Sequence, residues 1–216
     1  MIIMAMIVNE IFESLQGESS YAGLPCIFVR LTGCNLRCKW CDTKYAYEDG
    51  KEIQCSEIVR LINSSKTEII EFTGGEPLLQ KDELTKVISG IDSSKTILLE
   101  TNGSMSLKGI PERVVKIADI KLKGSGEGGS FLKDNLGFIK KTDEIKFVLS
   151  GKNDYDEMKD YLLRYNLEEK YSVLVSRVKN AELTDREIAD MILKDGLKVR
   201  YQIQIHKIIW GEERGK

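Results

Sequence analysis

The chain alternates between short runs of apolar, β-branched or aromatic residues and longer stretches whose apolar residues recur at helical spacing. Six of the short runs predict strands, and a seventh alternates as an edge strand does. These runs cover residues 26–31, 68–72, 96–99, 117–122, 144–149 and 171–175, with the edge strand at 198–205. Alternating strands and helices favour a parallel sheet covered by helices.

Three stretches predict amphipathic helices. Ser56 is placed to cap the first, and Thr184 with Glu187 forms a capping box before the third. The apolar faces of these helices consist of Ile58, Val59, Leu61 and Ile62, then Tyr155, Met158, Leu162 and Leu163, then Ile188, Met191 and Ile192. About six strand–helix units, rather than the eight of a closed barrel, predict an incomplete (βα)6-type partial TIM barrel. No linker divides the sequence, so we expect one domain over residues 1–216.

Chemically distinctive residues gather where the predicted strands end. A cysteine-rich segment, 34–41, follows the first strand, and the glycine-rich segment 73–77 follows the second. Glu100-Thr101-Asn102-Gly103 follows the third strand, and Lys123-Gly124 follows the fourth. Because barrel active sites are built at the carboxyl ends of the strands, these segments predict one shared site.

Three cysteines in the first of these segments, Cys34, Cys38 and Cys41, have the spacing C-x-x-x-C-x-x-C. Thiolates this close on one loop are typical of an iron–sulfur cluster, and a [4Fe–4S] cluster normally takes four of them. The loop supplies three, which leaves one iron open to a ligand, as catalytic metal sites leave a position open. Gly33 allows the backbone to turn sharply before the first ligand.

Two other interpretations of the cysteines stay open at this point. Structural zinc usually needs a second pair of ligands, and the single histidine, His206, lies far away in a predicted strand, where a structural role is usual. Cys26 or Cys55 as a fourth ligand would indicate an electron carrier. Cys26 lies inside an apolar strand and Cys55 just before a helix, which favours small buried side chains.

Composition narrows the class of partner. With 42% hydrophobic and 31% charged residues and a net charge of −2, the chain has no surplus of basic residues for coating nucleic acid. We therefore expect a small-molecule ligand and no direct contact with nucleic acid. Residues 1–8 are apolar but too short to span a bilayer and lack the flanks of a signal peptide, so no membrane association is expected. Five cysteines without a secretory signal indicate thiolate chemistry in the cytoplasm.

The cysteine segment, with Trp40 before the last ligand, resembles the radical S-adenosylmethionine superfamily. Thr73-Gly74-Gly75-Glu76-Pro77 resembles the superfamily's second signature, which binds the amino group of the methionine. Further segments are similar to the 7-carboxy-7-deazaguanine synthases: residues 10–18, 28–31, 41–43, 73–80, 100–104, 206–207 and 210–211. That family converts 6-carboxy-5,6,7,8-tetrahydropterin to 7-carboxy-7-deazaguanine with loss of ammonia, on the route to queuosine and archaeosine.

The resemblance implies a role for particular residues. The cluster ligands would be Cys34, Cys38 and Cys41, and the adenosylmethionine contacts would be Trp40, Cys41, Asp42, Gly75, Glu76, Lys121, Leu122 and Lys123. The pterin contacts would be Leu15, Gln16, Gly17, Arg30 and Thr73, and Thr43 would help to hold Mg²⁺. The resemblance also implies a flavodoxin- or ferredoxin-type reductant and a homodimer.

Residues 119–123 differ from the common family sequence and also suggest an alternative function. Many family members have Ser-Pro-Lys where this chain has Lys121-Leu122-Lys123, with Lys123 at the position of the family lysine. Asp119-Ile120-Lys121 also resembles activases of glycyl-radical enzymes, which is the alternative function.

For three residues a purely structural role is an alternative to the functional one. Arg30 shares a strand face with Phe28, and an arginine inside a barrel requires an anionic partner such as a substrate carboxylate. The plainer possibility for Arg30 is an outward ion pair. Glu76 would otherwise be a solvated loop carboxylate, and Trp40 would otherwise be packed in the core.

Overall fold

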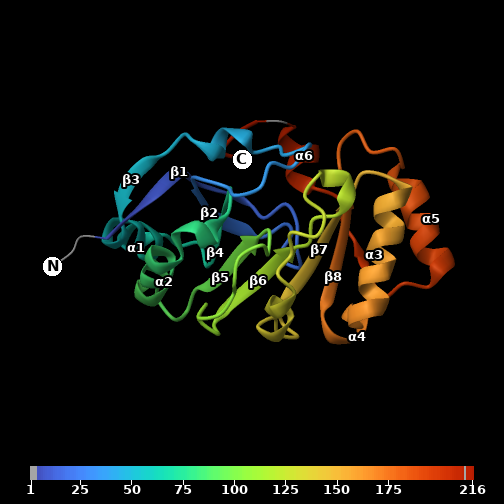
Figure 1. Cartoon of the computed structure of the whole chain (residues 1–216). Helices are drawn as coiled ribbons and strands as arrows, with labels where there is room; N and C mark the ends of the chain where they lie inside the picture. The colour runs from blue at the N-terminus through green and yellow to red at the C-terminus, as the bar shows by residue number, and fades with distance from the viewer. Residues whose placement is uncertain (1–3, 212) are drawn as a thin grey trace.

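The computed structural model describes residues 4–211 and 213–216. It contains one mixed sheet of nine strands in the order β3-β1-β2-β4-β5-β6-β7-β8-β9. The strands are β1 (Ala5–Leu15), β2 (Pro25–Leu31), β3 (Lys51–Gln54), β4 (Ile69–Gly74), β5 (Thr96–Thr101), β6 (Val114–Asp119), β7 (Glu144–Leu149), β8 (Ser172–Arg177) and β9 (Arg200–Tyr201). All neighbours from β2 to β9 pair in parallel, whereas β1 pairs antiparallel with both β2 and β3. The sheet is curved but not closed, so the expected incomplete barrel is confirmed (Figure 1).

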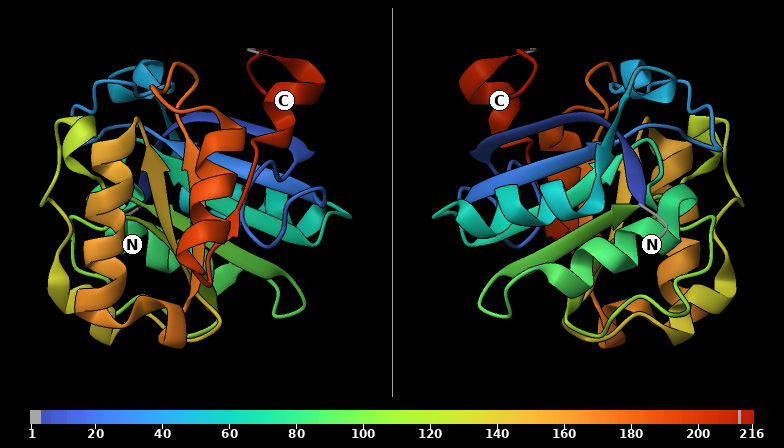
Figure 2. Two further views of the ribbon diagram at one scale, coloured as in Figure 1. Left: turned by 90° about the vertical axis from the view of Figure 1, so that its right-hand side faces the viewer. Right: turned by 90° about the vertical axis from the view of Figure 1, so that its left-hand side faces the viewer.

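Helices pack around the curved sheet, most of them on its outer face (Figures 1 and 2). They are α1 (Cys55–Ser64), α2 (Lys81–Gly90), α3 (Lys152–Tyr165), α4 (Leu167–Lys170), α5 (Asp185–Asp195) and α6 (Ile205–Trp210), with the 3₁₀ turns η1 (Lys44–Tyr47), η2 (Pro77–Gln80), η3 (Lys123–Ser125) and η4 (Lys133–Gly137). The connections after β5 and β6 contain no α-helix in residues 102–113 and 120–143, all of which the structure describes. None of the described helices is long and apolar enough to cross a bilayer.

The strand predictions are right for most of the parallel sheet and wrong in β6 and at the margins of the sheet. β1 and β3 are missing from the prediction, because β1 includes a polar stretch of mixed exposure and β3 spans only four residues. The fourth predicted strand, 117–122, lies three residues earlier, in β6. The predicted edge strand 198–205 shortens to β9, and His206 lies in α6 rather than in a strand.

The three predicted helices correspond to α1, α3 and α5, whereas α2, α4 and α6 are missing from the prediction. The Thr184–Glu187 capping box is present at the start of α5. Ser56 is not a cap, because α1 begins at Cys55 and its N-cap is Gln54. Leu163 is 86% exposed, although the helical pattern placed it on the apolar face with Leu162, which is 3% exposed.

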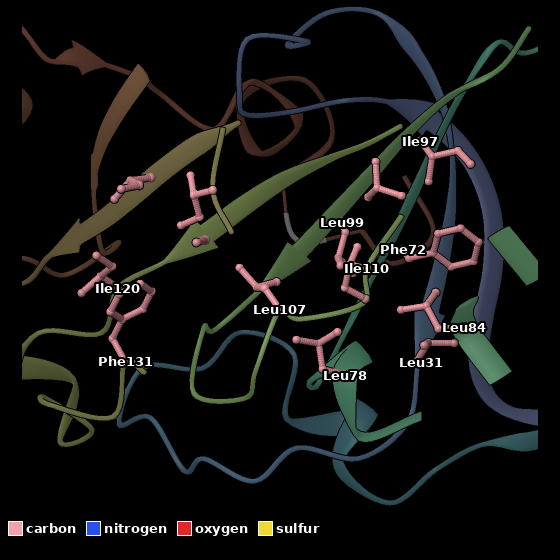
Figure 3. Packing of buried hydrophobic residues seen from close by; sticks show 14 of the residues in the cluster. Leu31, Phe72, Leu78, Leu84, Ile97, Leu99, Leu107, Ile110, Ile120 and Phe131 are labelled. Atoms are coloured by element: carbon pink, nitrogen blue, oxygen red, sulfur yellow. The ribbon is translucent and has the colours of Figure 1, made fainter. Parts of the chain in front are cut away.

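Two layers of apolar side chains hold the sheet. The larger one lies between the strands and the helices, where Leu84 of α2 faces Leu31 of β2 and Phe72 of β4 (Figure 3). The smaller one, Cys26, Ile69, Leu98 and Ile117, lies on the opposite face of four adjacent strands. Because side chains alternate along a strand, the same inner face continues with polar residues toward the carboxyl ends. These residues include Arg30, Glu71, Glu100, Asp119 and Lys146.

Candidate active site

A cavity of about 640 Å³ lies at the carboxyl ends of the parallel strands. Its walls come from the ends of β1, β2 and β4 to β8, from the cysteine loop and from the C-terminal segment that includes α6. α6 and η1 lie at the same end of the molecule in both figures (Figures 1 and 2). The cavity has the size of a small-molecule site and lies on the face where barrel enzymes act.

The cysteine loop, residues 34–41, is held against the loop that follows β6. The Lys39 N–H donates to the Ser125 carbonyl at 2.9 Å, and the Arg37 N–H donates to Glu127 Oε1 at 2.6 Å. Within the loop, Arg37 Nη1 donates to the Cys34 carbonyl at 2.7 Å. Cys34, Cys38 and Cys41 are half-buried free thiols, and all three line the cavity.

The loop fits an iron–sulfur cluster better than a single metal ion. Among residues 4–211 and 213–216, no group of three or more histidine, cysteine, aspartate or glutamate side chains is arranged to hold one ion. A [4Fe–4S] cluster takes its cysteines at separate corners of a cube, so the three sulfurs need not converge on one point. The three thiols share one cavity with room for a ligand, and the cluster is the group that this donor set suits.

The glycine-rich segment packs directly beneath the cysteine loop. A β-carbon on Gly75 would lie 2.0 Å from the Gly33 carbonyl oxygen, so only glycine allows this approach. Glu76 is fully buried, and its carboxylate accepts from Leu78 N–H at 2.9 Å, Thr101 Oγ1 at 2.8 Å and Asn102 N–H at 2.8 Å. Burial raises the pKa of Glu76. The alternative of a solvated loop carboxylate is wrong, since Glu76 ties the ends of β4 and β5 together.

The structure brings most of the predicted site residues to the cavity wall. These are Leu15, Gln16, Gly17, Arg30, Cys34, Cys38, Trp40, Cys41, Asp42, Thr43, Thr73, Gly75 and Lys121. Glu76, Leu122 and Lys123 are not part of the wall. Trp40 is half-buried at the wall and is not part of either apolar layer.

Because β6 ends three residues earlier than predicted, a different lysine reaches the cavity. Asp119 and Lys121 continue the inward alternation, and Lys121 Nζ pairs with Asp119 Oδ2 at 2.7 Å. Leu122 is 1% exposed and belongs to the large apolar layer. Lys123 is exposed in η3 and lines a separate cavity with the start of α3. The structure therefore places Lys121, and not Lys123, in the wall of the cavity that the three cysteines also line.

A buried ionic network forms the cavity floor, and the sequence analysis missed it. Lys146 Nζ pairs with Glu100 Oε1 at 2.8 Å and also with Glu18. Burial alone would lower the pKa of Lys146, but Glu100 and Glu18 raise it well above its usual range. Glu71 is 1% exposed, accepts a hydrogen bond from Gln16 Nε2, and has a pKa raised mainly by burial and next by Glu100. The available signal was the alternation of Glu144 and Lys146 in the otherwise apolar strand β7.

Gln16 is fixed at both ends of its amide. Its Oε1 accepts from the Glu18 N–H at 2.8 Å, while its Nε2 donates to Glu71. Gln16 is 4% exposed. The amide therefore reaches the cavity in one orientation.

The C-terminal segment contributes residues that the sequence analysis placed elsewhere. His206 lines the cavity, and a β-carbon on Gly17 would lie 1.8 Å from His206 Nδ1. The Ile205 N–H donates to the Gly17 carbonyl at 3.0 Å. Lys207 Nζ pairs with Asp42 Oδ2 at 2.8 Å, and Thr43 Oγ1 donates to Asp42 Oδ1 at 2.9 Å. Since α6 contacts the loops after β1 and β2, it completes one wall of the cavity.

Comparison with known proteins agrees with this site. Residues 28–130 match the model of the radical SAM superfamily. The chain is 42% identical to the 7-carboxy-7-deazaguanine synthase of Koribacter versatilis, over 96% of this chain and 98% of that protein. It is also 42% identical to the enzyme of the same name from Thermoplasma acidophilum, over 97% and 100% of the two chains.

One solved structure shows the same fold. The crystal structure of QueE from Escherichia coli superimposes with a TM-score of 0.73 at 21% identity, covering 92% of this chain and 94% of that chain. At this identity the likeness supports the architecture alone. The near full-length identity to the two enzymes above is what decides the family: the chain belongs to the 7-carboxy-7-deazaguanine synthases of the radical SAM superfamily.

Proposed function

We propose that the protein converts 6-carboxy-5,6,7,8-tetrahydropterin to 7-carboxy-7-deazaguanine with loss of ammonia, within 7-deazapurine biosynthesis. The observation that supports this most is the single cavity at the carboxyl ends of the strands. It unites three thiols on one loop with an arginine, an oriented glutamine amide and a glycine-rich segment. A cluster module for electron transfer or a structural zinc site would not need such a cavity beside its ligands.

Cys34, Cys38 and Cys41 would hold the [4Fe–4S] cluster and leave its fourth iron open. When bound, the reduced cluster supplies the electron that cleaves S-adenosylmethionine and so generates the radical that takes hydrogen from C6 of the pterin. Trp40, Asp42 and Lys121 lie at the wall nearest the cysteine loop, and Gly75 presents backbone there. These residues would orient the adenosylmethionine and exclude water, which is the protein's part in cofactor chemistry.

Glu76 stays a predicted contact of the methionine ammonium. A carboxylate offers about four acceptor positions, and three of those on Glu76 are used by the protein. Any contact would use the fourth. Leu122 and Lys123 are left out of the proposed set, because one is in the core and the other faces a different cavity.

The pterin would lie over the cavity floor. Gln16 offers one N–H in a fixed direction, and Leu15, Gly17 and Thr73 line the same wall. Arg30 would meet the pterin carboxylate. Thr43 and the neighbouring Asp42 carboxylate supply oxygen atoms of the kind Mg²⁺ prefers, and we propose Mg²⁺ between this wall and the pterin.

The remaining proposals concern the cellular setting. We expect a flavodoxin- or ferredoxin-type reductant, a homodimer, no direct contact with nucleic acid and a cytoplasmic location. The five free cysteines support a reducing compartment. Size measurement in solution tests the dimer, and turnover with a purified flavodoxin tests the reductant.

An anaerobic assay tests the reaction directly. The reconstituted, reduced protein is incubated with S-adenosylmethionine and the pterin deuterated at C6, and products are identified by mass spectrometry. We expect 7-carboxy-7-deazaguanine together with 5′-deoxyadenosine that contains the label. Turnover that requires a second polypeptide would instead identify a glycyl-radical activase, and absence of 5′-deoxyadenosine would contradict both radical functions.

A further inference from the structure

Arg30 has an anionic partner inside the protein before any ligand arrives. Glu10 and Arg30 face each other across the antiparallel pair β1–β2. Glu10 Oε1 accepts from Arg30 Nε at 2.8 Å and from the Tyr45 hydroxyl at 2.9 Å. Arg30 is 16% and Glu10 20% exposed, so the pair is largely buried, and Arg30 lines the cavity with Glu10 behind it.

Aromatic rings restrict the guanidinium further. Its central carbon lies 5.8 Å from the ring centroid of Phe12 and 5.9 Å from that of Tyr45. Phe12 stacks on Phe28 with centroids 5.0 Å apart and an interplanar angle of 12°, so that ring is itself held. Arg214, from the C-terminal segment, packs on Tyr45 at 3.6 Å from the ring centroid.

These contacts determine which donors are left for a ligand. A guanidinium has five N–H donors in a rigid fork, and the Nε donor is taken by Glu10. Neither Nη atom of Arg30 donates to another described residue. The two Nη atoms form an edge with parallel N–H groups, which matches the two oxygens of a carboxylate.

We propose that Glu10 and Tyr45 are positioning residues that hold Arg30 with its Nη edge toward the cavity, where it takes a ligand carboxylate in bidentate fashion. The identity of that ligand as the carboxylated pterin rests on the proposed function. The proposal assigns to the wall a role in specificity, because it would separate the carboxylated pterin from one that lacks the carboxylate.

Electrostatic repulsion and positioning predict opposite effects of Glu10→Ala on the affinity for a ligand carboxylate. A carboxylate beside Arg30 repels an incoming carboxylate, so charge alone predicts that Glu10→Ala tightens binding. Positioning predicts that Glu10→Ala weakens binding, because the guanidinium can then turn away. Glu10→Gln separates the two effects, since an amide oxygen still accepts from Arg30 and Tyr45 but has no charge.

The test measures equilibrium binding to the reconstituted holoenzyme with S-adenosylmethionine, unreduced so that no turnover occurs. The probes are the carboxylated tetrahydropterin and the same pterin without the carboxylate. For the carboxylated probe we expect Glu10→Ala to weaken binding about tenfold and Tyr45→Phe about threefold, with Glu10→Gln within about threefold of the unchanged protein. The probe without the carboxylate should bind all three variants with nearly unchanged affinity.

Steady-state kinetics supply a second readout. Tyr45→Phe should raise KM for the pterin with little change in kcat, the pattern expected when binding is lost equally from ground and transition states. Tighter binding in Glu10→Ala, or equal weakening for both probes, would overturn the proposal.

Arg30→Ala distinguishes this proposal from the proposed function. If Arg30→Ala leaves the affinity for the carboxylated probe unchanged, the assignment of Arg30 to the substrate fails. If Arg30→Ala weakens binding while Glu10→Ala and Tyr45→Phe do not, only the positioning proposal fails.

Discussion

At the scale of single residues, the site depends on side chains whose partners come from distant parts of the chain. The cysteine loop is local in sequence, but Glu76, Lys146 and Arg30 obtain their roles from other strands. Lys146 lies between two carboxylates and is 7% exposed, a burial that an unpaired lysine would not tolerate.

Replacement of the loop cysteines should separate cluster ligands from structural thiols. We expect Cys38→Ala to lose the reconstituted cluster, measured as bound iron and sulfide and as visible absorption. Cys55→Ala is the matched control, because Cys55 is a buried free thiol in α1. Loss of the cluster in the control would point to a fourth cysteine ligand and an electron carrier.

Lys146→Met should destabilise the ligand-free chain by about 3–5 kcal/mol, because it leaves the largely buried carboxylates of Glu18 and Glu100 without their paired cation. Chemical denaturation checks this. Lys159→Met is the control, since Lys159 pairs with Asp195 at 2.7 Å near the surface, where a pair contributes about 1 kcal/mol or less.

The loss of stability in Lys146→Met should depend on pH, and the direction follows from the pKa of Glu100. Burial raises the pKa of Glu100 while Lys146 and then Lys121 lower it, with a net lowering. Without Lys146 the pKa of Glu100 in the folded state rises. Between the ordinary carboxyl pKa and this raised pKa, folded Glu100 holds a proton that unfolded Glu100 has released, so acidification favours the folded state of the variant. The deficit relative to the unchanged protein should therefore shrink as pH falls from neutral toward that ordinary range. A deficit that grows on acidification would contradict this.

At the scale of elements, caps and close approaches decide where segments begin and how they meet. In α5 the Thr184 hydroxyl accepts from the Glu187 N–H while the Glu187 carboxylate accepts from the Thr184 N–H. α6 has no such cap, and its position instead depends on contact with the loop after β1.

Thr184→Ala should lower the free energy of unfolding by about 1 kcal/mol, because it removes one half of the capping box. Ser56→Ala is the matched control. Ser56 lies exposed inside α1 without a capping bond, so its replacement should change stability by less than about 0.5 kcal/mol. Thermal unfolding of both variants measures the difference.

Gly17→Ala should loosen α6 more than the sheet. Its β-carbon would overlap the His206 ring, so the ring and the Ile205 hydrogen bond must move. We expect faster amide exchange in α6 with little change in melting temperature. In a His206→Ala background the same substitution should add little, and equal effects in both backgrounds would argue against this contact.

At the scale of the whole molecule, one continuous sheet connects every part of the chain. Its apolar layer runs from Met6 of β1 to Ile192 of α5 without a break. We therefore predict that the ligand-free protein unfolds as one domain, with coincident transitions in circular dichroism and tryptophan fluorescence. Two separated transitions would contradict the single-domain prediction.

The sequence by itself determined most of the parallel strands, three of the six described helices and the cysteine loop, because these depend on local periodicity and spacing. The motifs at the strand ends also determined the family and most of the cavity wall.

Only the tertiary structure decided which side chains meet inside the barrel. Whether Lys121 or Lys123 faces the cavity depends on where β6 ends. β6 lies three residues earlier than predicted, and periodicity in an apolar run does not specify the ends of a strand. The contacts of Lys146 with Glu18, of Glu10 with Arg30 and of His206 with Gly17 join residues far apart in the chain. Such pairs follow from the curvature and register of the sheet, and these are properties of the whole chain.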